Sequence, residues 1–195
     1  PVRVTASVVT RSRRGRRTLR TEDGLVSDSY DSPWKDALSQ FLEPFLVLLF
    51  PEVEKEVDWT QEVSFLETEL RKLSREAEQG PREADALVEV GLRTGERGRL
   101  WIHIEVQSQW AGSFAERVFI GHQRVRERFG GPVCSLAVLA DSSPTWRPDR
   151  YLWEGFGCRL EFSFPVAKLA DYRERMDELE QSPNPFAVIV AAHLL

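Results

Sequence analysis

The first regular pattern of apolar residues along the chain has the spacing of a helix. Asp31, Ser32 and Pro33 form a typical helix start. The apolar residues that follow recur every three or four positions: Trp34, Leu38, Phe41, Leu42, Phe45, Leu46 and Leu49. Because proline lacks an N–H and clashes with the preceding turn, Pro44 predicts a kink or a break in this helix.

The spacing then changes to that of strands. Residues 53–66 alternate weakly and predict a first strand around residues 57–65. Residues 84–90 predict a second strand, and residues 100–107 predict a third. Glycines between the last two segments predict a hairpin turn. Residues 67–79 are rich in Glu, Leu, Lys and Arg, which favours a short helix or helical arm.

The second half of the chain alternates between the two kinds of element. The patterns predict an amphipathic helix, a buried strand, a loop, another strand and two helices, at 113–128, 133–139, 141–149, 158–166, 168–181 and 186–195. For Trp146, Tyr151 and Trp153 we expect packing in or beside the loop rather than stacking on bases. The order predicts an α/β fold of the α+β type, with a mixed sheet flanked by helices.

Charge is distributed unevenly along the 195 residues. Residues 1–20 carry seven arginines and no acidic residue, whereas the rest of the chain carries 19 basic and 31 acidic residues. We therefore expect residues 1–28 to be a disordered leader and residues 29–195 to be one domain. An acidic domain attracts nucleic acid only through metal ions or a local basic patch.

Several features bear on the compartment of the protein. The chain has no apolar run long enough for a transmembrane helix, and its first residues lack the apolar stretch of a signal peptide. Cys134 and Cys158 are too few for a disulfide framework, so we predict a cytoplasmic protein, although one bridge between them stays open. Because the chain ends inside an apolar run, we also expect a domain truncated at its C-terminus.

The segment from Trp101 to Gln107 alternates strictly between apolar and polar residues. Since successive side chains of a strand point to opposite faces, His103, Glu105 and Gln107 share one face. The preceding strand can place Asp85 on that same face, opposite Glu105. Two carboxylates on neighbouring strands, with a backbone carbonyl, suit Mg²⁺ or Mn²⁺, which can activate water against a phosphodiester. Such alternation is also common in half-exposed structural strands.

The order of elements and the motifs together resemble a known nuclease family. The chain is similar to the recombination-promoting nucleases (Rpn, or YhgA-like putative transposases) of the PD-(D/E)XK superfamily, whose core is a restriction-endonuclease-like αβββαβ. The residues that carry the resemblance are Asp31–Lys35, Asp85, Ile104–Ser108, Phe114–Phe119, Val133–Leu139 and Trp146–Arg150. The resemblance covers roughly residues 29–195.

The resemblance implies a set of site residues. Asp85 and Glu105 would bind the metal ion, together with the backbone carbonyl of Val106. Gln107 would be catalytic at the position where many members of the superfamily have lysine, and Gln can hydrogen-bond but carries no charge. On the first helix, Glu43 and Lys35 are further candidate contributors.

The helix at 113–128 offers a candidate surface for DNA. Arg117, Arg124 and Arg128 fall on one stripe, and guanidinium groups suit bidentate contacts with phosphate. A solvated helix face explains the same pattern. His122 lies near the apolar stripe, where we expect a packed histidine rather than a base.

These observations predict an Mg²⁺-dependent DNA endonuclease associated with recombination or mobile elements. The alternative is a catalytically silent protein with a nuclease fold that binds DNA or protein. Another metal-dependent hydrolase is less favoured, because the three histidines show no zinc-like spacing. The sequence also leaves a homodimer open.

Overall fold

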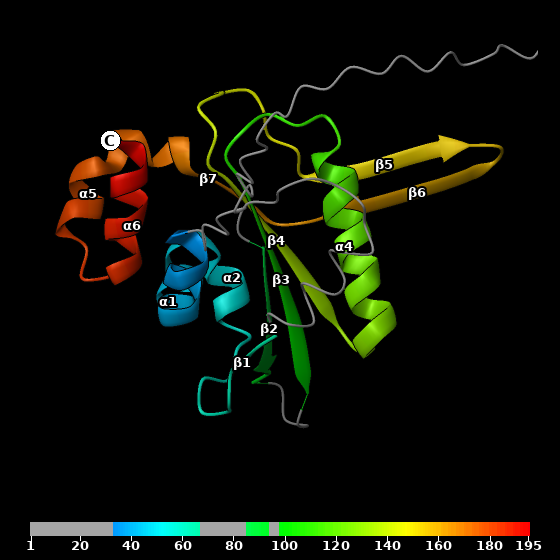
Figure 1. The fold of residues 1–195 in the computed structure, drawn as a ribbon, viewed down its shortest axis with the longest axis horizontal. Coiled ribbons are helices and arrows are strands. Elements are labelled where there is room, and N and C mark those ends of the chain that lie inside the picture. The colour runs from blue at the N-terminus through cyan, green and yellow to red at the C-terminus, as the bar shows by residue number, and fades with distance from the viewer. Residues whose placement is uncertain (1–32, 67–84, 94–97) are drawn as a thin grey trace, which may run out of the picture. The chain divides into compact units, whose positions relative to one another are not determined.

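A five-stranded mixed sheet organises the protein. The computed structural model describes residues 33–66, 85–93 and 98–195, and the strands of its main sheet lie in the order β1-β2-β3-β4-β7 (Figure 1). The order of elements from α1 to β4 is the αβββαβ arrangement that the sequence predicts. The leader, the helix-start residues Asp31 and Ser32, and the predicted arm at 67–79 lie outside the described residues.

The first helix has the kink that its proline predicts. α1 (Pro33–Leu49) contains Pro44, and its helical dihedral angles are interrupted at Phe41, three residues earlier. This is the turn with which the proline ring interferes, since the ring excludes the regular backbone of the preceding turn. A second, short helix, α2 (Pro51–Glu54), follows directly and begins with its own proline.

The prediction of a nine-residue first strand at 57–65 is wrong. β1 spans only Ser64–Phe65, and Val57 makes an isolated bridge to Leu92. Between them, Asp58 accepts hydrogen bonds from Thr60 and from the side chain of Gln61, which forms a turn. An aspartate that binds the backbone two residues ahead favours a turn over an extended ladder.

The central strands follow the sequence prediction closely. β2 (Asp85–Gly91) pairs antiparallel with β3 (Arg99–Gln107), so the expected hairpin is present. β3 then pairs parallel with β4 (Val133–Leu139), and the connection between them is α4 (Phe114–Phe129). The short strand β7 (Val166–Lys168) extends the sheet in parallel with β4. The carboxyl ends of β3, β4 and β7 therefore lie at the same edge of the sheet.

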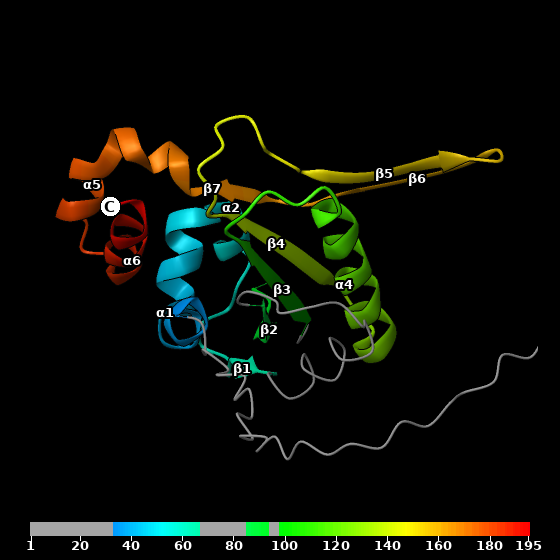
Figure 2. The ribbon, with the colours of Figure 1, turned by 45° about the horizontal axis from the view of Figure 1, so that its top comes forward.

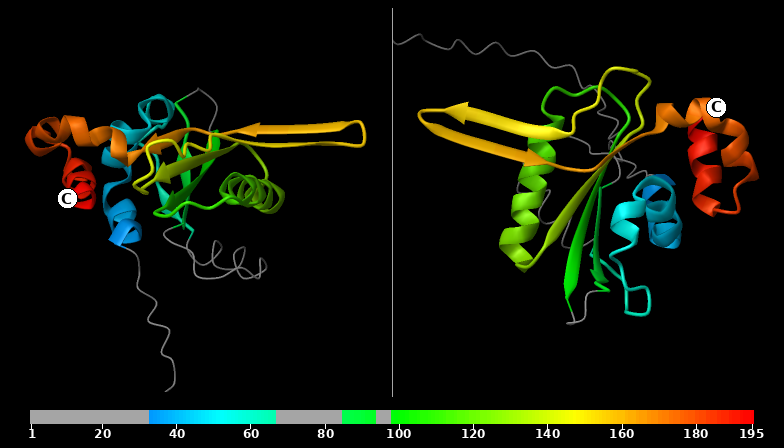
Figure 3. Two further views of the ribbon diagram at one scale, coloured as in Figure 1. Left: turned by 90° about the horizontal axis from the view of Figure 1, so that it is seen from above. Right: turned by 180° about the vertical axis from the view of Figure 1, so that it is seen from behind.

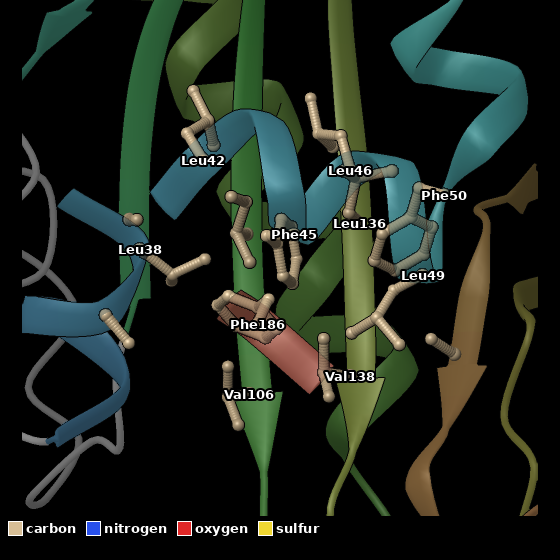
Figure 4. Packing of buried hydrophobic residues seen from close by; sticks show 14 of the residues in the cluster. Leu38, Leu42, Phe45, Leu46, Leu49, Phe50, Val106, Leu136, Val138 and Phe186 are labelled. Carbon is tan, nitrogen blue, oxygen red and sulfur yellow. The ribbon is translucent and has the colours of Figure 1, made fainter. Parts of the chain in front are cut away.

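Helices cover both faces of this sheet (Figure 2). On one face, α1 and the last helix pack on the apolar side chains of β3 and β4, which include Val106, Leu136 and Val138 (Figure 4). On the other face, α4 contributes Phe114 and Val118 to a smaller cluster. The larger face is entirely apolar, whereas the face under α4 also carries buried polar residues.

The structure contains a second hairpin, which the pattern of residues did not predict. β5 (Arg150–Gly155) pairs antiparallel with β6 (Cys158–Ser163) in a separate two-stranded sheet, and the expected single strand at 158–166 is divided between β6 and β7. Figure 3 shows this ribbon projecting from the domain. Cys158 lies on it and is exposed, whereas Cys134 is partly buried in β4, and both thiols are free.

The C-terminal helices lie close to where the sequence places them, except that Lys168, expected at the start of a helix, belongs to β7. A 3₁₀ helix, η1 (Leu169–Arg175), leads into α5 (Met176–Gln181), and α6 (Pro185–Leu194) follows. The side chain of Asn184 caps α6 by accepting a hydrogen bond from the N–H of Phe186, which is a core residue. None of the helices in the described ranges is both long and apolar enough to cross a membrane.

Candidate metal-dependent site

The polar face of β3 is the one that the alternation predicts. Ile102, Ile104 and Val106 are buried in the large core on the α1 side. His103 and Glu105 are buried as well, with exposed fractions of 2% and 5%. They lie beneath α4, so the polar face is not a half-exposed strand surface. Burying a carboxylate is costly unless charged or polar groups surround it, and the side chains around Glu105 therefore define the site.

The register of the hairpin places Asp85 and Glu105 opposite each other. The two residues are Cα partners in the antiparallel pairing of β2 with β3. Directly paired residues belong to the same face of a sheet, so position 85 belongs to the polar face. The structure describes Asp85 through its backbone alone. This register is the arrangement that the sequence predicts for the two carboxylates.

Glu105 lies next to two nitrogen-bearing side chains. Its Oε1 is 3.5 Å from Nε2 of His103, and its Oε2 is 3.6 Å from a terminal nitrogen of Arg117. The histidine comes from the same strand, two residues earlier, and the arginine from the first turn of α4. These two side chains are polar partners for the buried carboxylate.

Arg117 is directed toward the site and not toward solvent. Its guanidinium donates a hydrogen bond to Oε1 of Gln107 over 2.5 Å and lies above the ring of Phe114. The amide of Gln107 in turn donates to the carbonyl of Gln109. Gln107 therefore holds Arg117 beside Glu105, a positioning role that the sequence did not reveal.

One donor of this arginine has no acceptor. The Nε of Arg117 is buried and makes no hydrogen bond within the part of the chain that the structure describes. A buried donor without a partner costs about 1–3 kcal/mol. Such exceptions are rare in folded proteins and are found where strain, a ligand or a bound ion has a role.

A second polar group lies beside Glu105 under α4. The hydroxyl of Ser135 on β4 is 3.2 Å from Nδ1 of His103 and 3.2 Å from Nδ1 of His122 on α4. Ser135 and His103 are paired positions of the parallel ladder, which explains why they meet. The close approach of α4 depends on Gly121, because a Cβ there would lie 2.5 Å from the His103 ring.

The environment of His122 favours its neutral form. Burial lowers the pKa of this imidazole below its ordinary value, and the neighbouring His103 and Arg126 lower it further. Its ring also packs on Phe162 of β6, with 4.6 Å between the centroids. These contacts agree with the expectation of a packed histidine.

The other predicted contributors lie away from Glu105. Arg128 is exposed near the end of α4 and lies over the ring of Phe129, and Arg124 is partly buried one turn earlier. Lys35 and the exposed Glu43 belong to α1, which covers the opposite face of the sheet. Among the predicted contributors, Arg117 is thus the residue whose described contacts reach both Glu105 and Gln107.

A buried ion pair at the same edge of the sheet was not predicted. Lys168 on β7 donates to Asp141, which follows β4, over 2.5 Å, and both side chains are almost fully buried. The register aligns Lys168 with Leu139, and Leu139 with Gln107, so all three share the face under α4. In the sequence Lys168 looks like a solvated helix residue, and only its pairing reveals it.

With a carboxylate from position 85 beside Glu105, this face would offer the ligands that a hard divalent cation prefers. Two carboxylates at paired positions and the carbonyl of Val106 are all-oxygen ligands, which Mg²⁺ and Mn²⁺ prefer. Among the side chains that the structure describes, which exclude that of Asp85, no cluster of three or more His, Cys, Asp and Glu is arranged for a metal ion. The fit therefore depends on position 85.

No protein-family model, no curated protein and no solved structure matches this chain. The likeness to the recombination-promoting nucleases therefore rests on the motifs of the chain itself.

Proposed function

We propose that the protein is an Mg²⁺- or Mn²⁺-dependent DNA endonuclease of the recombination-promoting nuclease type, acting in the cytoplasm on recombining or mobile DNA. The observation that carries this proposal is the pairing of Asp85 with the buried Glu105 on the polar face of the sheet. A carboxylate buried as deeply as that of Glu105 is expensive for a purely structural strand. Such a carboxylate serves a purpose if it binds a cation.

The chain's own residues have distinct roles in this proposal. Asp85, Glu105 and the carbonyl of Val106 would hold the cation, which supplies an activated water and neutralises charge on the phosphodiester. Gln107 cannot replace the positive charge of lysine. It orients Arg117 instead, and Arg117 brings a guanidinium to within 3.6 Å of Glu105.

Arg117 would contact the scissile phosphate. A guanidinium binds phosphate oxygens bidentately, and the buried Nε of Arg117 has no acceptor among the residues that the structure describes. Because arginine stays protonated at neutral pH, this group stabilises negative charge but does not remove the proton of water.

The test is a plasmid-nicking assay with Mg²⁺ or Mn²⁺. We expect Asp85→Ala and Glu105→Gln each to lower the nicking rate by about 100-fold or more, since even indirect partners of a metal ligand are worth about 10–100-fold. The glutamine keeps the shape of the buried side chain. Glu127→Gln, at an exposed position of α4, is the matched control and should nick at the wild-type rate.

Thermal melting with added cation tests binding separately. A ligand that binds only the folded state raises its stability, so Mn²⁺ should raise the melting temperature of the wild type and of Glu127→Gln alone. Equal nicking by all four proteins would disprove the site assignment.

A catalytically silent binding module is the second candidate. The observation that favours it is the contact of Glu105 with Arg117 and His103, which compensates the buried charge without a cation. Divalent-metal calorimetry distinguishes the two, because the silent protein would release no heat that depends on Asp85 and Glu105. DNA binding without metal-dependent cleavage would also favour this alternative.

A further inference from the structure

The β5–β6 hairpin is an amphipathic ribbon that extends past the helix on which it packs. All views show it projecting beyond α4 (Figures 1 and 3). Its two strands are joined by Phe156 and Gly157, both with positive φ. The side chain of Phe156 is fully exposed at this tip. A two-stranded hairpin by itself is marginally stable in water, so its uncovered half needs an explanation.

One face of the ribbon is apolar, and α4 covers only its base. Tyr151 and Phe162 are paired residues on this face, and both pack on Phe119 of α4, with centroid distances of 5.1 and 5.6 Å. The next pair on the same face is Trp153 and Leu160. Trp153 is 44% exposed, so the apolar face continues beyond the helix.

The charged residues of the ribbon balance one another. Glu154 and Glu161 on the opposite face lie within 4 Å of arginines of the same ribbon: Arg159 is 3.9 Å from Glu154 and 3.0 Å from Glu161, and Arg150 is 3.7 Å from Glu161. With two basic and two acidic residues, the ribbon has no excess positive charge for phosphates. A protein surface suits it better than nucleic acid.

The sequence of β5 is self-complementary when two copies run antiparallel. It reads Arg150-Tyr151-Leu152-Trp153-Glu154. A two-fold axis through Leu152 places Arg150 opposite Glu154 of the second copy, Tyr151 opposite its Trp153, and Leu152 opposite itself. Each pair is a favourable cross-strand combination, and an interface that pairs a surface with itself is what two-fold symmetry requires.

This pairing also covers two exposed apolar residues of β5, Leu152 and Trp153. Trp153 of one copy comes to lie beside Tyr151 of the other copy, next to the aromatic rings that pack on α4. Leu152, which is 48% exposed, meets its own copy on the other face. The free edge of β5 gains backbone hydrogen bonds, and two ribbons become one four-stranded sheet.

Pairing through β6 is the competing geometry. A two-fold axis through Leu160 matches Arg159 with Glu161, but it leaves β5 at the outside with Leu152 and Trp153 uncovered. We therefore propose that the protein forms a two-fold homodimer through antiparallel pairing of β5 with β5 of a second copy. The interface is small, so the dimer should dissociate on dilution. This inference does not depend on the proposed nuclease activity.

Charge reversal tests the register directly. Arg150→Glu and Glu154→Arg each place like charges opposite one another twice in a homodimer, so each variant alone should be monomeric. An equimolar mixture should form dimers, because both cross-strand pairs are then opposite in sign. Sedimentation velocity on the full chain, whose monomer mass is 22.4 kDa, measures these states over a concentration series.

The matched control reverses charges on β6. Mixing Arg159→Glu with Glu161→Arg should give no larger fraction of dimer than either variant gives alone. Rescue by the β6 pair and not by the β5 pair would overturn the proposal. A wild-type chain that stays monomeric at every concentration would overturn it too. So would a Trp153→Ala variant that loses DNA binding but keeps the monomer–dimer equilibrium of the wild type.

Crosslinking gives a second readout that does not depend on charge. In a Cys158→Ser background, Leu152→Cys should form an intermolecular disulfide on mild oxidation, because Cα atoms of paired residues lie about 4.5–5.5 Å apart, within disulfide range. Leu160→Cys in the same background should crosslink far less. Equal crosslinking at both positions would contradict the β5 register.

Discussion

Gly121 lies where α4 passes closest to β3. A Cβ at this position would be 2.5 Å from Cε1 and 3.0 Å from Nε2 of His103, whose side chain is 2% exposed and cannot move into solvent. Gly121→Ala should therefore destabilise the fold by about 1–3 kcal/mol. This clash opposes the roughly 1 kcal/mol by which alanine favours a helix over glycine.

Urea denaturation measures the effect, and Gly112 offers the comparison. A Cβ at Gly112 would meet the exposed ring of Trp110, which can turn away, so Gly112→Ala should change stability by less than about 0.5 kcal/mol. A double variant with His103→Ala should recover part of the loss if the clash is the cause. Unchanged stability of Gly121→Ala would mean that α4 lies farther from the sheet.

At the scale of the elements, the Lys168–Asp141 pair joins β7 to the residues that follow β4. Both side chains are almost fully buried, and Asp141 also accepts a hydrogen bond from the N–H of Ser143. Lys168→Met leaves a buried carboxylate without its partner, so we expect a loss of about 3–5 kcal/mol in unfolding free energy. Adding Asp141→Asn should restore part of it, since the amide oxygen still accepts from Ser143.

The exposed ion pair of Arg147 with Asp171 is the control for the buried Lys168–Asp141 pair. These side chains are about half exposed, and ion pairs in water contribute roughly 0–1 kcal/mol. Arg147→Met should therefore change stability by less than about 1 kcal/mol in the same denaturation series. A similar small loss for Lys168→Met would show that water reaches the buried pair.

The hairpin β5–β6 illustrates which elements a linear pattern can miss. Tyr151, Leu152 and Trp153 are consecutive large residues and do not alternate with polar ones, so residues 150–155 resemble the end of a proline-rich loop. The structure shows that Leu152 and Trp153 occupy opposite faces of a ribbon that has little core beneath it. Strand periodicity depends on one face being buried, and here much of both faces is exposed.

At the scale of the whole molecule, charge predicts how the proposed DNA binding would depend on metal. Outside residues 1–20 the chain has 31 acidic against 19 basic residues, so its bulk field repels DNA. We expect a labelled duplex to bind measurably in Mg²⁺ and at least about tenfold more weakly in EDTA at equal ionic strength. Fluorescence anisotropy measures both affinities, and equal affinity in EDTA would show that the arginines suffice.

Much of the site arrangement was predictable from sequence because it is local or periodic. Alternation assigns His103, Glu105 and Gln107 to one face, and the short connection to residues 84–90 places Asp85 opposite Glu105. The amphipathic pattern places α4 after this hairpin, and Pro44 produces the kink in α1. Each of these features depends on neighbours within a few residues or on a single turn.

Only the tertiary structure decided which residues share the space under α4. The contacts of Arg117 with Gln107, of His103 with Ser135, and of Lys168 with Asp141 join residues 10 to 32 positions apart. Side chains so far apart meet because parallel pairing and a crossover helix bring their strands together, and no periodicity encodes that meeting. The carboxylate pair was therefore predictable from the hairpin, whereas its charged and hydrogen-bonded surroundings required the assembled sheet.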